Sequence, residues 1–170
     1  MLTGAAIYEQ MGHNIQIIPF NKDQLNPDSY NVKLHDELLV YKNKTLDCKI
    51  DNPTEKITIP KEGYTLQPGV GYLGRTVEWT STEQFCPYIG GRSSTGRLFL
   101  AIHVTAGQGE TGFKGHWTLE MVVTQPLVVY PFMEVAQLTF WETKGEKTPY
   151  SGKYQNNKGI QSSKLFKELQ

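Results

Sequence analysis

Hydrophobic and polar residues alternate in many short runs along this chain. Alternation with a period of two is the pattern of a β-strand with one buried face. It is clearest at residues 98–104 and 117–123, and similar runs occupy residues 32–40, 57–59, 64–80, 127–130 and 135–141. The run at 32–40 contains a break near Asp36, and turn residues such as Gln125-Pro126 separate other runs. Many short strands with little helix predict an all-β sandwich or barrel.

The two ends of the chain differ from this β pattern. Residues 2–11 are typical of a short helix, and Thr3 can cap its first turn. Residues 143–170 are polar and rich in glycine, lysine and asparagine, a composition that suits a flap closing over a ligand. At 170 residues the chain is long enough for one core. We therefore expect a single β domain over residues 1–170, of which about 143–170 form a C-terminal flap or tail.

Charge and hydropathy exclude several functional classes. Lys+Arg and Asp+Glu both number 17, and this balance argues against a general nucleic-acid-binding protein. A small anionic ligand would need only a local cluster of positive charge. The N-terminal residues lack the pattern of a signal peptide, and no apolar run approaches the roughly 20 residues that span a membrane. We expect a cytoplasmic protein that binds neither nucleic acid nor a membrane.

The two cysteines do not suggest a metal site. Cys48 and Cys86 are 38 positions apart, and the chain contains no Cys-x-x-Cys pair. A structural zinc site is therefore not expected. Two reduced thiols are the simpler interpretation, although spacing alone leaves a disulfide between them open.

Residues 90–97 form a compact group that we call the arginine cluster. The guanidinium groups of Arg92 and Arg97 can each donate two parallel hydrogen bonds to phosphate oxygens. Between them lie three hydroxyl side chains and a glycine that lets the backbone approach a ligand: Ser93, Ser94, Thr95 and Gly96. The spacing is not that of a P-loop. The residues predict either a phosphate-binding site or an ordinary polar connection before a strand.

Glu120 is the one carboxylate within the strand predicted at 117–123. It lies on the parity opposite to the apolar residues, so an isolated sheet would turn it to solvent. If a barrel or an oligomer interface covered that face, the carboxylate would be desolvated, which suits a group that shuttles protons. A bend with three glycines at residues 105–113, the glycine bend, precedes it and carries Glu110. It is compatible with a simple hairpin loop, and we expect His103 to be packed or hydrogen-bonded rather than catalytic.

Taken in order, these motifs resemble the dCTP deaminase family of the trimeric dUTPase superfamily. The resemblance covers most of the chain and rests on Asn-Pro-x-Ser-Tyr at 26–30, Gly-Arg-Ser-Ser-x-Gly-Arg at 91–97, Thr-Ala-Gly at 105–107, Gly-Phe at 112–113, Thr-Leu-Glu at 118–120, Ala-Gln-Leu at 136–138 and Lys-Tyr-Gln at 153–155 with Gly159. The family implies a distorted jelly-roll or β-barrel subunit. It also implies a homotrimer with active sites at the subunit interfaces.

The resemblance also implies the chemistry. The family deaminates dCTP at C4 of cytosine without a protein-bound metal, and the zinc deaminase signature is absent here. Mg²⁺ is expected on the substrate phosphates, and dTTP is implied as a feedback inhibitor. Glu120 would be the general acid and base, with Arg97, Ser93 and Ala106 positioning water and substrate. The residues implied to bind the nucleotide are Arg92, Ser93, Ser94, Thr95, Gly96, Arg97, Glu110, Thr118, Leu119, Glu120, Gln137, Tyr150, Lys153 and Asn157.

Some family members release dUTP, whereas others cleave it further to dUMP and pyrophosphate. Gly107-Gln108 stands where members that release dUTP tend to carry His-Arg, so the resemblance favours the dUMP-forming type. Three positions depart from the usual residues: Glu110 replaces aspartate, Gln108 replaces an aromatic residue or arginine, and Asn157 replaces glutamine. The alternatives are a deaminase that releases dUTP, a plain dUTPase, and a non-catalytic nucleotide-binding module.

Overall fold

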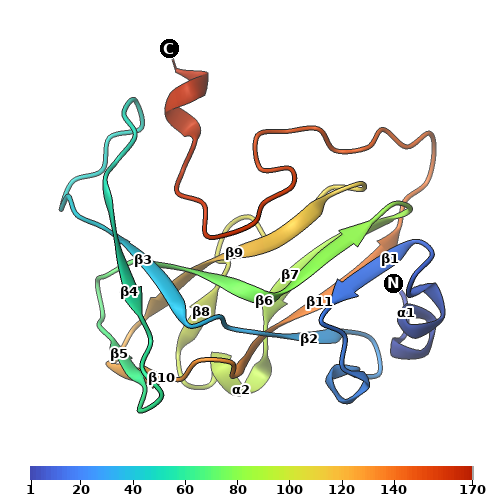
Figure 1. Cartoon of the computed structure of the whole chain (residues 1–170), viewed down its shortest axis with the longest axis horizontal. Coiled ribbons are helices and arrows are strands. Elements are labelled where there is room, and N and C mark those ends of the chain that lie inside the picture. Colours follow the sequence, from blue (N-terminus) through green and yellow to red (C-terminus); the bar gives the residue numbers. More distant parts are fainter. Residues whose placement is uncertain (170) are drawn as a thin grey trace.

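A computed structural model of the chain describes residues 1–169, in which β-strands dominate (Figure 1). The helical elements are short: α1 (Gly4–Gln10), η1 (Lys22–Gln24), α2 (Ser93–Gly96) and η2 (Leu165–Glu168). The strands are β1 (Ile15–Ile18), β2 (Tyr30–Lys33), β3 (Glu37–Tyr41), β4 (Thr54–Thr58), β5 (Tyr64–Leu66), β6 (Tyr72–Thr82), β7 (Phe85–Gly91), β8 (Leu100–Ile102), β9 (Lys114–Val123), β10 (Leu127–Val129) and β11 (Glu134–Glu142).

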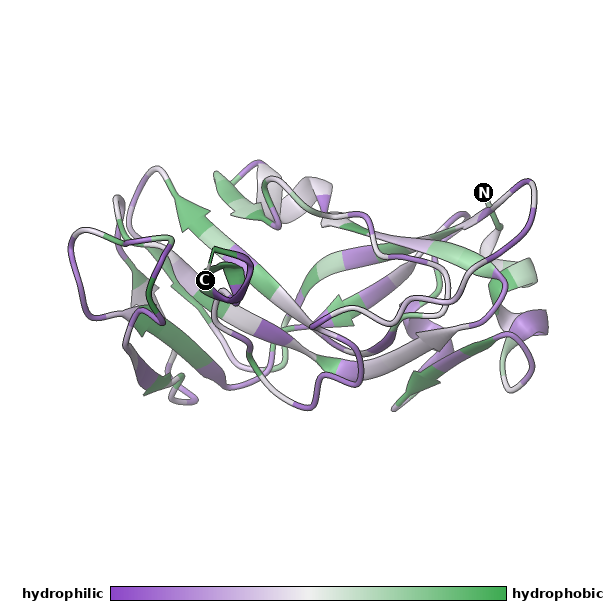
Figure 2. Ribbon diagram, turned by 90° about the horizontal axis from the view of Figure 1, so that it is seen from above, coloured by the Kyte–Doolittle hydropathy of each residue, from purple (hydrophilic) through white to green (hydrophobic). Residues whose placement is uncertain are grey.

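The strands form three antiparallel sheets. The largest has the order β4-β3-β6-β9-β8, and β1 also pairs with β6. A second sheet has the order β2-β11-β7, and β5 pairs with β10. Apolar and polar residues alternate along these strands, whereas the connecting loops are mostly polar (Figure 2). The prediction of an all-β fold of the jelly-roll type is confirmed.

The core is built by one face of each long strand. On β9 the apolar parity is buried as predicted, with Trp117, Leu119, Met121 and Val123 each at most 5% exposed. Across from Leu119 lies Gly74 of β6, where an added Cβ would be 2.9 Å from both Leu34 and Met121. A glycine there lets the packed side chains approach the strand. Burial extends to Tyr30, which is fully buried and whose pKa is raised to about 12, chiefly by desolvation.

The N-terminal helix and the strand break occur where the sequence predicts them. Helix α1 is capped by Thr3, whose hydroxyl accepts a hydrogen bond from the amide of Ala6 at 3.2 Å. The run at 32–40 is divided into β2 and β3, and Asp36 in the gap accepts a hydrogen bond from the amide of Ile59. Cys48 and Cys86 are both free thiols, so the interpretation as reduced cysteines is confirmed.

The strand predicted at 98–104 is wrong at both of its ends. Only Leu100–Ile102 pairs as β8, while Leu98 and Val104 are 57% and 59% exposed. The backbone of Phe99 has φ 57° and that of His103 has φ 55°. These left-handed conformations break the pleat on either side of β8. The helical turn α2, within the arginine cluster, was also not predicted.

No helix among residues 1–169 is long and apolar enough to cross a membrane. After β11 the C-terminal segment runs back over β9 and ends at η2, close to the connection between β3 and β4 (Figure 1). This path places residues far apart in sequence around one cavity.

Candidate active site

A cavity of about 620 Å³ lies between the outward face of β9, the glycine bend and the C-terminal segment. The glycine bend contributes Ala106, Gln108, Gly109, Glu110 and Phe113. Strand β9 contributes His116, Trp117, Thr118 and Glu120, and His103 follows β8. The C-terminal segment contributes Tyr150, Tyr154, Asn157, Gln161, Ser162 and Ser163. The volume is that of a typical small-molecule site, and its walls combine aromatic rings with a few polar groups.

Glu120 lies in this cavity on the parity that the sequence predicts to face away from the core. Its Oε2 is 2.8 Å from Nδ1 of His103, and the amide of His103 donates to the carbonyl oxygen of Glu120 at 3.0 Å. The histidine side chain is only 9% exposed, whereas that of Glu120 is 42% exposed. A largely buried imidazole therefore fixes one carboxylate oxygen and leaves the carboxylate accessible from the cavity.

The prediction that His103 is hydrogen-bonded is confirmed, but its partner was not foreseen. Strands β8 and β9 pair with Ile102 opposite Met121, which brings His103 alongside Glu120. The ring of His103 also lies edge-on to Trp117, with 6.3 Å between the ring centroids. Sequence spacing alone does not reveal this register. The one available signal is that a histidine directly follows a short strand, β8, that could pair with β9.

Aromatic side chains form one wall of the cavity. The rings of Phe113 and Trp117 are 5.0 Å apart, and those of Phe113 and Tyr150 are 6.2 Å apart. The indole of Trp117 donates its N–H to Thr80 at 3.0 Å, which fixes its orientation. Such a wall suits a flat heterocycle that packs against ring faces or edges.

His116 is a neutral group in this cavity at ordinary pH. Burial lowers its pKa, and the nearby Arg75 guanidinium lowers it further. Its Nδ1 lies 3.2 Å from the carbonyl oxygen of Thr76. Because a carbonyl oxygen only accepts hydrogen bonds, the neutral ring carries its one proton on Nδ1 and donates it to Thr76. The sequence did not single out His116 for the site.

The C-terminal segment covers the cavity through contacts with the glycine bend and β9. The amide of Tyr150 donates to the carbonyl oxygen of Thr111 at 2.8 Å, and the side-chain amide of Asn157 donates to the carbonyl oxygen of His116 at 3.0 Å. The amide of Gln161 donates to the Thr118 hydroxyl at 3.0 Å. The composition of residues 143–170 predicts a flap, but it does not predict that Tyr154, Gln161, Ser162 and Ser163 line the cavity.

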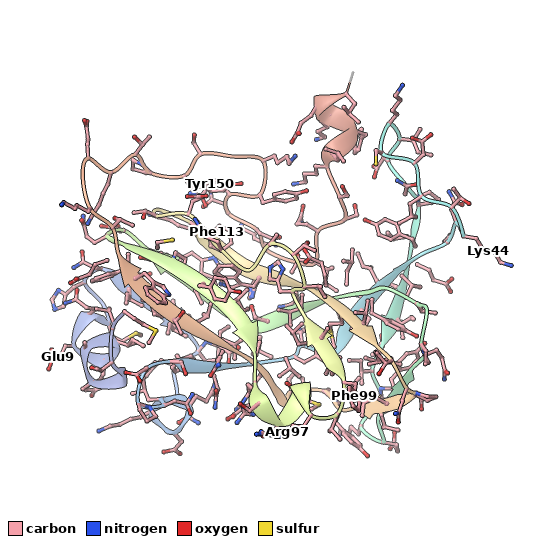
Figure 3. All side chains as sticks on the ribbon, turned by 180° about the vertical axis from the view of Figure 1, so that it is seen from behind. Glu9, Lys44, Arg97, Phe99, Phe113 and Tyr150 are labelled. Carbon is pink, nitrogen blue, oxygen red and sulfur yellow. The ribbon has the colours of Figure 1, made fainter. Side chains whose placement is uncertain are left out.

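The arginine cluster lies away from this cavity. Figure 3 shows Arg97 at the edge of the molecule opposite to Phe113 and Tyr150. Within the cluster Ser93, Ser94, Gly96 and Arg97 are exposed, whereas Thr95 is buried and donates its hydroxyl to the carbonyl oxygens of Arg92 and Val135. Within this chain the arginine cluster and the cavity that contains Glu120 are therefore separate.

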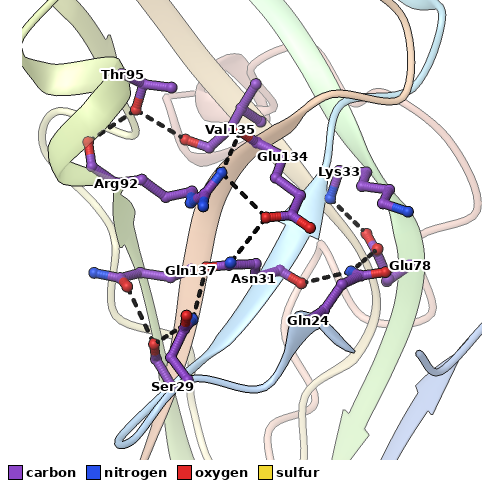
Figure 4. A network of polar contacts seen from close by, with 11 residues as sticks. Gln24, Ser29, Asn31, Lys33, Glu78, Arg92, Thr95, Glu134, Val135 and Gln137 are labelled. Carbon is purple, nitrogen blue, oxygen red and sulfur yellow. Dashed lines mark hydrogen bonds and ion pairs between the residues drawn. The ribbon is translucent and has the colours of Figure 1, made fainter. Parts of the chain in front are cut away.

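A chain of polar contacts connects the arginine cluster with the core (Figure 4). The Arg92 guanidinium lies 3.1 Å from Oε2 of Glu134 and also donates to the carbonyl oxygen of Glu134. Asn31 donates to the same carboxylate at 2.8 Å, and Gln24 bridges the backbone of Asn31 to Glu78. Burial raises the pKa of Glu78. The start of α2 is thus fixed by groups on β2, β6 and β11.

Three further residues predicted for the site do not line the cavity with their side chains. Leu119 is fully buried in the core. Gln137 lies beside the arginine cluster, where its amide donates to the carbonyl oxygen of Gly91 at 3.4 Å. Lys153 is exposed and pairs with Glu168 of η2. Ala106, Glu110, Thr118, Glu120, Tyr150 and Asn157 are the predicted residues that meet in the cavity.

Within residues 1–169 no group of three or more His, Cys, Asp or Glu side chains is arranged to hold a metal ion. The free thiol of Cys86 donates to the carbonyl oxygen of Gly109 at 3.1 Å. Its pKa is raised by burial and by Glu110.

Comparison with known proteins places these features in a family. The family model described as dCTP deaminase-like matches residues 1–143. A Clostridium beijerinckii protein named dCTP deaminase, dUMP-forming, is 53% identical over 100% of this chain and 99% of the relative. A Leptospira biflexa protein of the same name is 48% identical over 100% of this chain and 98% of the relative.

The fold also matches a solved structure, the 2'-deoxycytidine 5'-triphosphate deaminase from Agrobacterium tumefaciens. The TM-score is 0.66 at 18% sequence identity, over 82% of this chain and 46% of that chain. The chain therefore spans about half the length of that protein, and the likeness concerns the fold. Together with the match over residues 1–143, these findings show that the chain belongs to the dCTP deaminase-like family.

Proposed function

We propose that this protein is a hydrolase that deaminates dCTP and cleaves the resulting dUTP to dUMP and pyrophosphate. The observation that carries the proposal is the Glu120 carboxylate, fixed at 2.8 Å by His103 inside an aromatic-walled cavity. Relatives at about half identity over their whole length bear the name of this activity. The activity supplies dUMP, a precursor for pyrimidine deoxynucleotide synthesis.

In the first reaction, water adds to C4 of cytosine and ammonia leaves. Glu120 takes a proton from the attacking water and transfers it to N3, and the amino group departs after receiving the second proton. In a reaction without a protein-bound metal, no metal ion lowers the pKa of the attacking water, so fixed donors must stabilise the developing charge. We assign that role to Ser93, Arg97 and the backbone at Ala106, with the backbone of Thr118-Leu119 reading the cytosine edge.

In the second reaction, a water molecule attacks the α-phosphorus of dUTP. The bond from that phosphorus to the bridging oxygen breaks, and pyrophosphate leaves with this oxygen. We assign the proton acceptor to Glu110, which lines the same cavity on the glycine bend. Each reaction thus has its own carboxylate, one on a strand and one on a loop.

The separation of the arginine cluster from the cavity supports an active site shared between subunits. In the proposed homotrimer, the cluster of one subunit completes the cavity of its neighbour, so that Arg92, Ser93, Ser94, Gly96, Arg97 and Gln137 reach the nucleotide. The buried Thr95, predicted to bind the nucleotide, instead holds the turn through its contacts with the carbonyl oxygens of Arg92 and Val135. Leu98 and Phe99, which follow the cluster directly, are each 57% exposed, and Val122 on the neighbouring β9 is 41% exposed. Covering such apolar side chains favours association.

The triphosphate would be held by cationic and polar groups together with Mg²⁺. Since residues 1–169 offer no metal-binding cluster, the ion is proposed to bind through the phosphate oxygens, which is how Mg²⁺ commonly binds nucleotides. Tyr150, Lys153 and Asn157 of the C-terminal segment are proposed to contact the triphosphate. A nucleotide such as dTTP, with the same triphosphate, is the proposed feedback inhibitor.

The substitution Glu120→Gln tests the first reaction. It keeps the size of the side chain but removes the proton acceptor, so dCTP turnover should fall by about 100-fold or more while nucleotide binding persists. Glu142→Gln, the same change at an exposed position at the end of β11, is the matched control and should keep full turnover. Full turnover in Glu120→Gln would contradict the assignment.

Mixing two inactive variants tests the shared site. Glu120→Gln and Arg97→Ala damage different halves of the proposed site, so hybrid trimers would contain some sites with both intact residues. We expect activity to return when the two variants are unfolded together and refolded as a mixture. If the mixture stays as inactive as either variant alone, the site does not lie between subunits.

A further inference from the structure

Arg92 is held within its own chain by one nitrogen of its guanidinium group. Its Nη1 lies 3.1 Å from Oε2 of Glu134 and donates to the carbonyl oxygen of Glu134 at 3.0 Å. Each terminal nitrogen of a guanidinium group carries two hydrogens, so these two oxygens match both hydrogens of Nη1. Across residues 1–169, no oxygen accepts a hydrogen bond from Nε or Nη2 of Arg92.

The donors that stay free on Arg92 form one edge of its guanidinium group. One N–H of Nη2 lies beside the N–H of Nε and points the same way, and such an edge gives two parallel hydrogen bonds to the oxygens of one phosphate group. The Arg92 side chain is 28% exposed, so a ligand can reach it from outside the chain. Glu134 therefore occupies one nitrogen and leaves a complete phosphate-binding edge.

Glu134 can hold Arg92 because its own carboxylate is fixed from the core side (Figure 4). Nδ2 of Asn31 donates to Oε2 of Glu134 at 2.8 Å, and Asn31 is buried. Asn31 is oriented in turn by Asn26, whose Nδ2 donates to Oδ1 of Asn31 at 2.8 Å, and by Gln24, which donates to its carbonyl oxygen at 2.7 Å. Asn26 opens the Asn-Pro-x-Ser-Tyr motif, to which the proposed function gives no role. The motif thus supports the carboxylate that holds the arginine.

The backbone of the arginine cluster does not depend on the side chain of Glu134. Thr95 donates its hydroxyl to the carbonyl oxygens of Arg92 and Val135, which connects the turn α2 to β11. Strand β7, which leads into the cluster, pairs with β11 over its whole length. Loss of the Glu134 carboxylate therefore frees the side chain of Arg92 but keeps Ser93, the first residue of α2, in place.

We propose that Glu134 is a positioning residue for nucleotide binding, which holds Arg92 so that its Nε and Nη2 edge is presented to a phosphate group of the substrate. The proposal rests on the proposed function, in which Arg92 of one subunit reaches the nucleotide in the cavity of its neighbour. A free arginine side chain loses its rotamer freedom when it binds a ligand, and this loss corresponds to roughly a tenfold change in affinity. Glu134 removes that cost, because the side chain is ordered before the nucleotide arrives.

The test compares kcat and KM for the loss of dCTP, with Mg²⁺ present, in Glu134→Ala, Arg92→Ala and the double variant. We expect Glu134→Ala to raise KM about tenfold and to change kcat by less than about threefold. Because Glu134 acts through Arg92, the double variant should have the KM of Arg92→Ala, with no further increase. Glu142→Ala, at an exposed position at the other end of β11, is the matched control and should keep the KM of the unsubstituted protein.

A purely structural role for Glu134 would add to the effect of Arg92→Ala, whereas a positioning role disappears once Arg92 is gone. The proposal is overturned if Glu134→Ala raises KM equally with and without Arg92. It is also overturned if Glu134→Ala leaves KM unchanged or lowers it, since a lower KM would mean that the carboxylate repels the phosphates. In these cases a raised KM in Arg92→Ala leaves the proposed function intact.

If Arg92→Ala itself leaves KM unchanged, Arg92 does not bind the nucleotide, and that part of the proposed function fails together with this proposal. Should Glu134→Ala fail to fold, Glu134→Gln carries the same comparison. Its amide keeps an oxygen that accepts from Asn31 and Arg92 but loses the charge that strengthens these bonds. We expect its KM to rise about threefold, and this rise should again vanish when Arg92 is replaced by alanine.

Discussion

Gln155 is the residue that we expect to attach the C-terminal segment over the cavity. Its side-chain Nε2 donates to the carbonyl oxygens of Gly112 and Tyr150, both at 2.7 Å, and its Oε1 accepts from the amide of Lys114 at 2.8 Å. One side chain thus connects the segment to itself, to the glycine bend and to the start of β9. The substitution Gln155→Ala removes all three bonds without touching the residues proposed to react with substrate.

The size of the effect follows from these contacts. Two of these bonds, with Gly112 and Lys114, join the segment to the domain, so at about 1 kcal/mol net for each bond the loss of attachment is about 2 kcal/mol. Because each 1.4 kcal/mol corresponds to a factor of ten, the population of the detached segment should rise roughly 30-fold. The amides of Tyr150, Asn156 and His116, which bond between the segment and the domain, report this opening directly.

Amide hydrogen exchange measures the opening, because exchange at these sites follows local detachment rather than global unfolding. We expect exchange at the three amides to accelerate by up to about 30-fold in Gln155→Ala, with a raised KM for dCTP. Lys158→Ala is the control, because Lys158 is exposed and its side chain makes no hydrogen bond to the described residues. Equal exchange in the two variants would refute the argument that Gln155 holds the segment down.

Two further predictions concern pH. Burial raises the pKa of Glu78 above its ordinary value of 4.5, so the folded protein binds more protons than the unfolded chain once the pH exceeds 4.5. The free energy of unfolding should therefore fall as the pH rises from 4.5 through the raised pKa, and urea titrations of Glu78→Gln should show a flatter dependence. Burial lowers the pKa of His116 below 6.5, so stability should also decrease as the pH falls below 6.5. Thermal unfolding of His116→Gln should show a smaller decrease, and an unchanged decrease would show that His116 does not cause it.

The β9 strand shows what the sequence can predict. Its alternation assigned Trp117 and Leu119 to the core and Glu120 to the other face, and the structure agrees. This worked because a long strand with one fully buried face imposes its period on the sequence directly. The same alternation failed at Leu98 and Val104, where left-handed residues flank a strand of only three residues. A period of two does not report where the backbone leaves the pleat.

The surroundings of Glu120 and of the glycine bend could not be predicted in the same way. The contact between His103 and Glu120 depends on the register of β8 against β9. A side chain at Gly107 is excluded by the carbonyl oxygen of Ile89 on β7, which lies 2.4 Å from the ideal Cβ position. Both are long-range relations that no local pattern encodes. The separation of the arginine cluster from the cavity could not be predicted from the sequence either, since motifs that are neighbours in a chain need not meet when it folds.

The central claim is that this protein converts dCTP to dUMP. It is tested most directly by incubating the purified protein with dCTP and Mg²⁺ and separating the products by anion-exchange chromatography. We predict dUMP and pyrophosphate with little free dUTP, despite glutamate at position 110. Release of dUTP alone would contradict the second reaction, and an absence of dCTP turnover would contradict the assignment of Glu120 as the deaminating carboxylate.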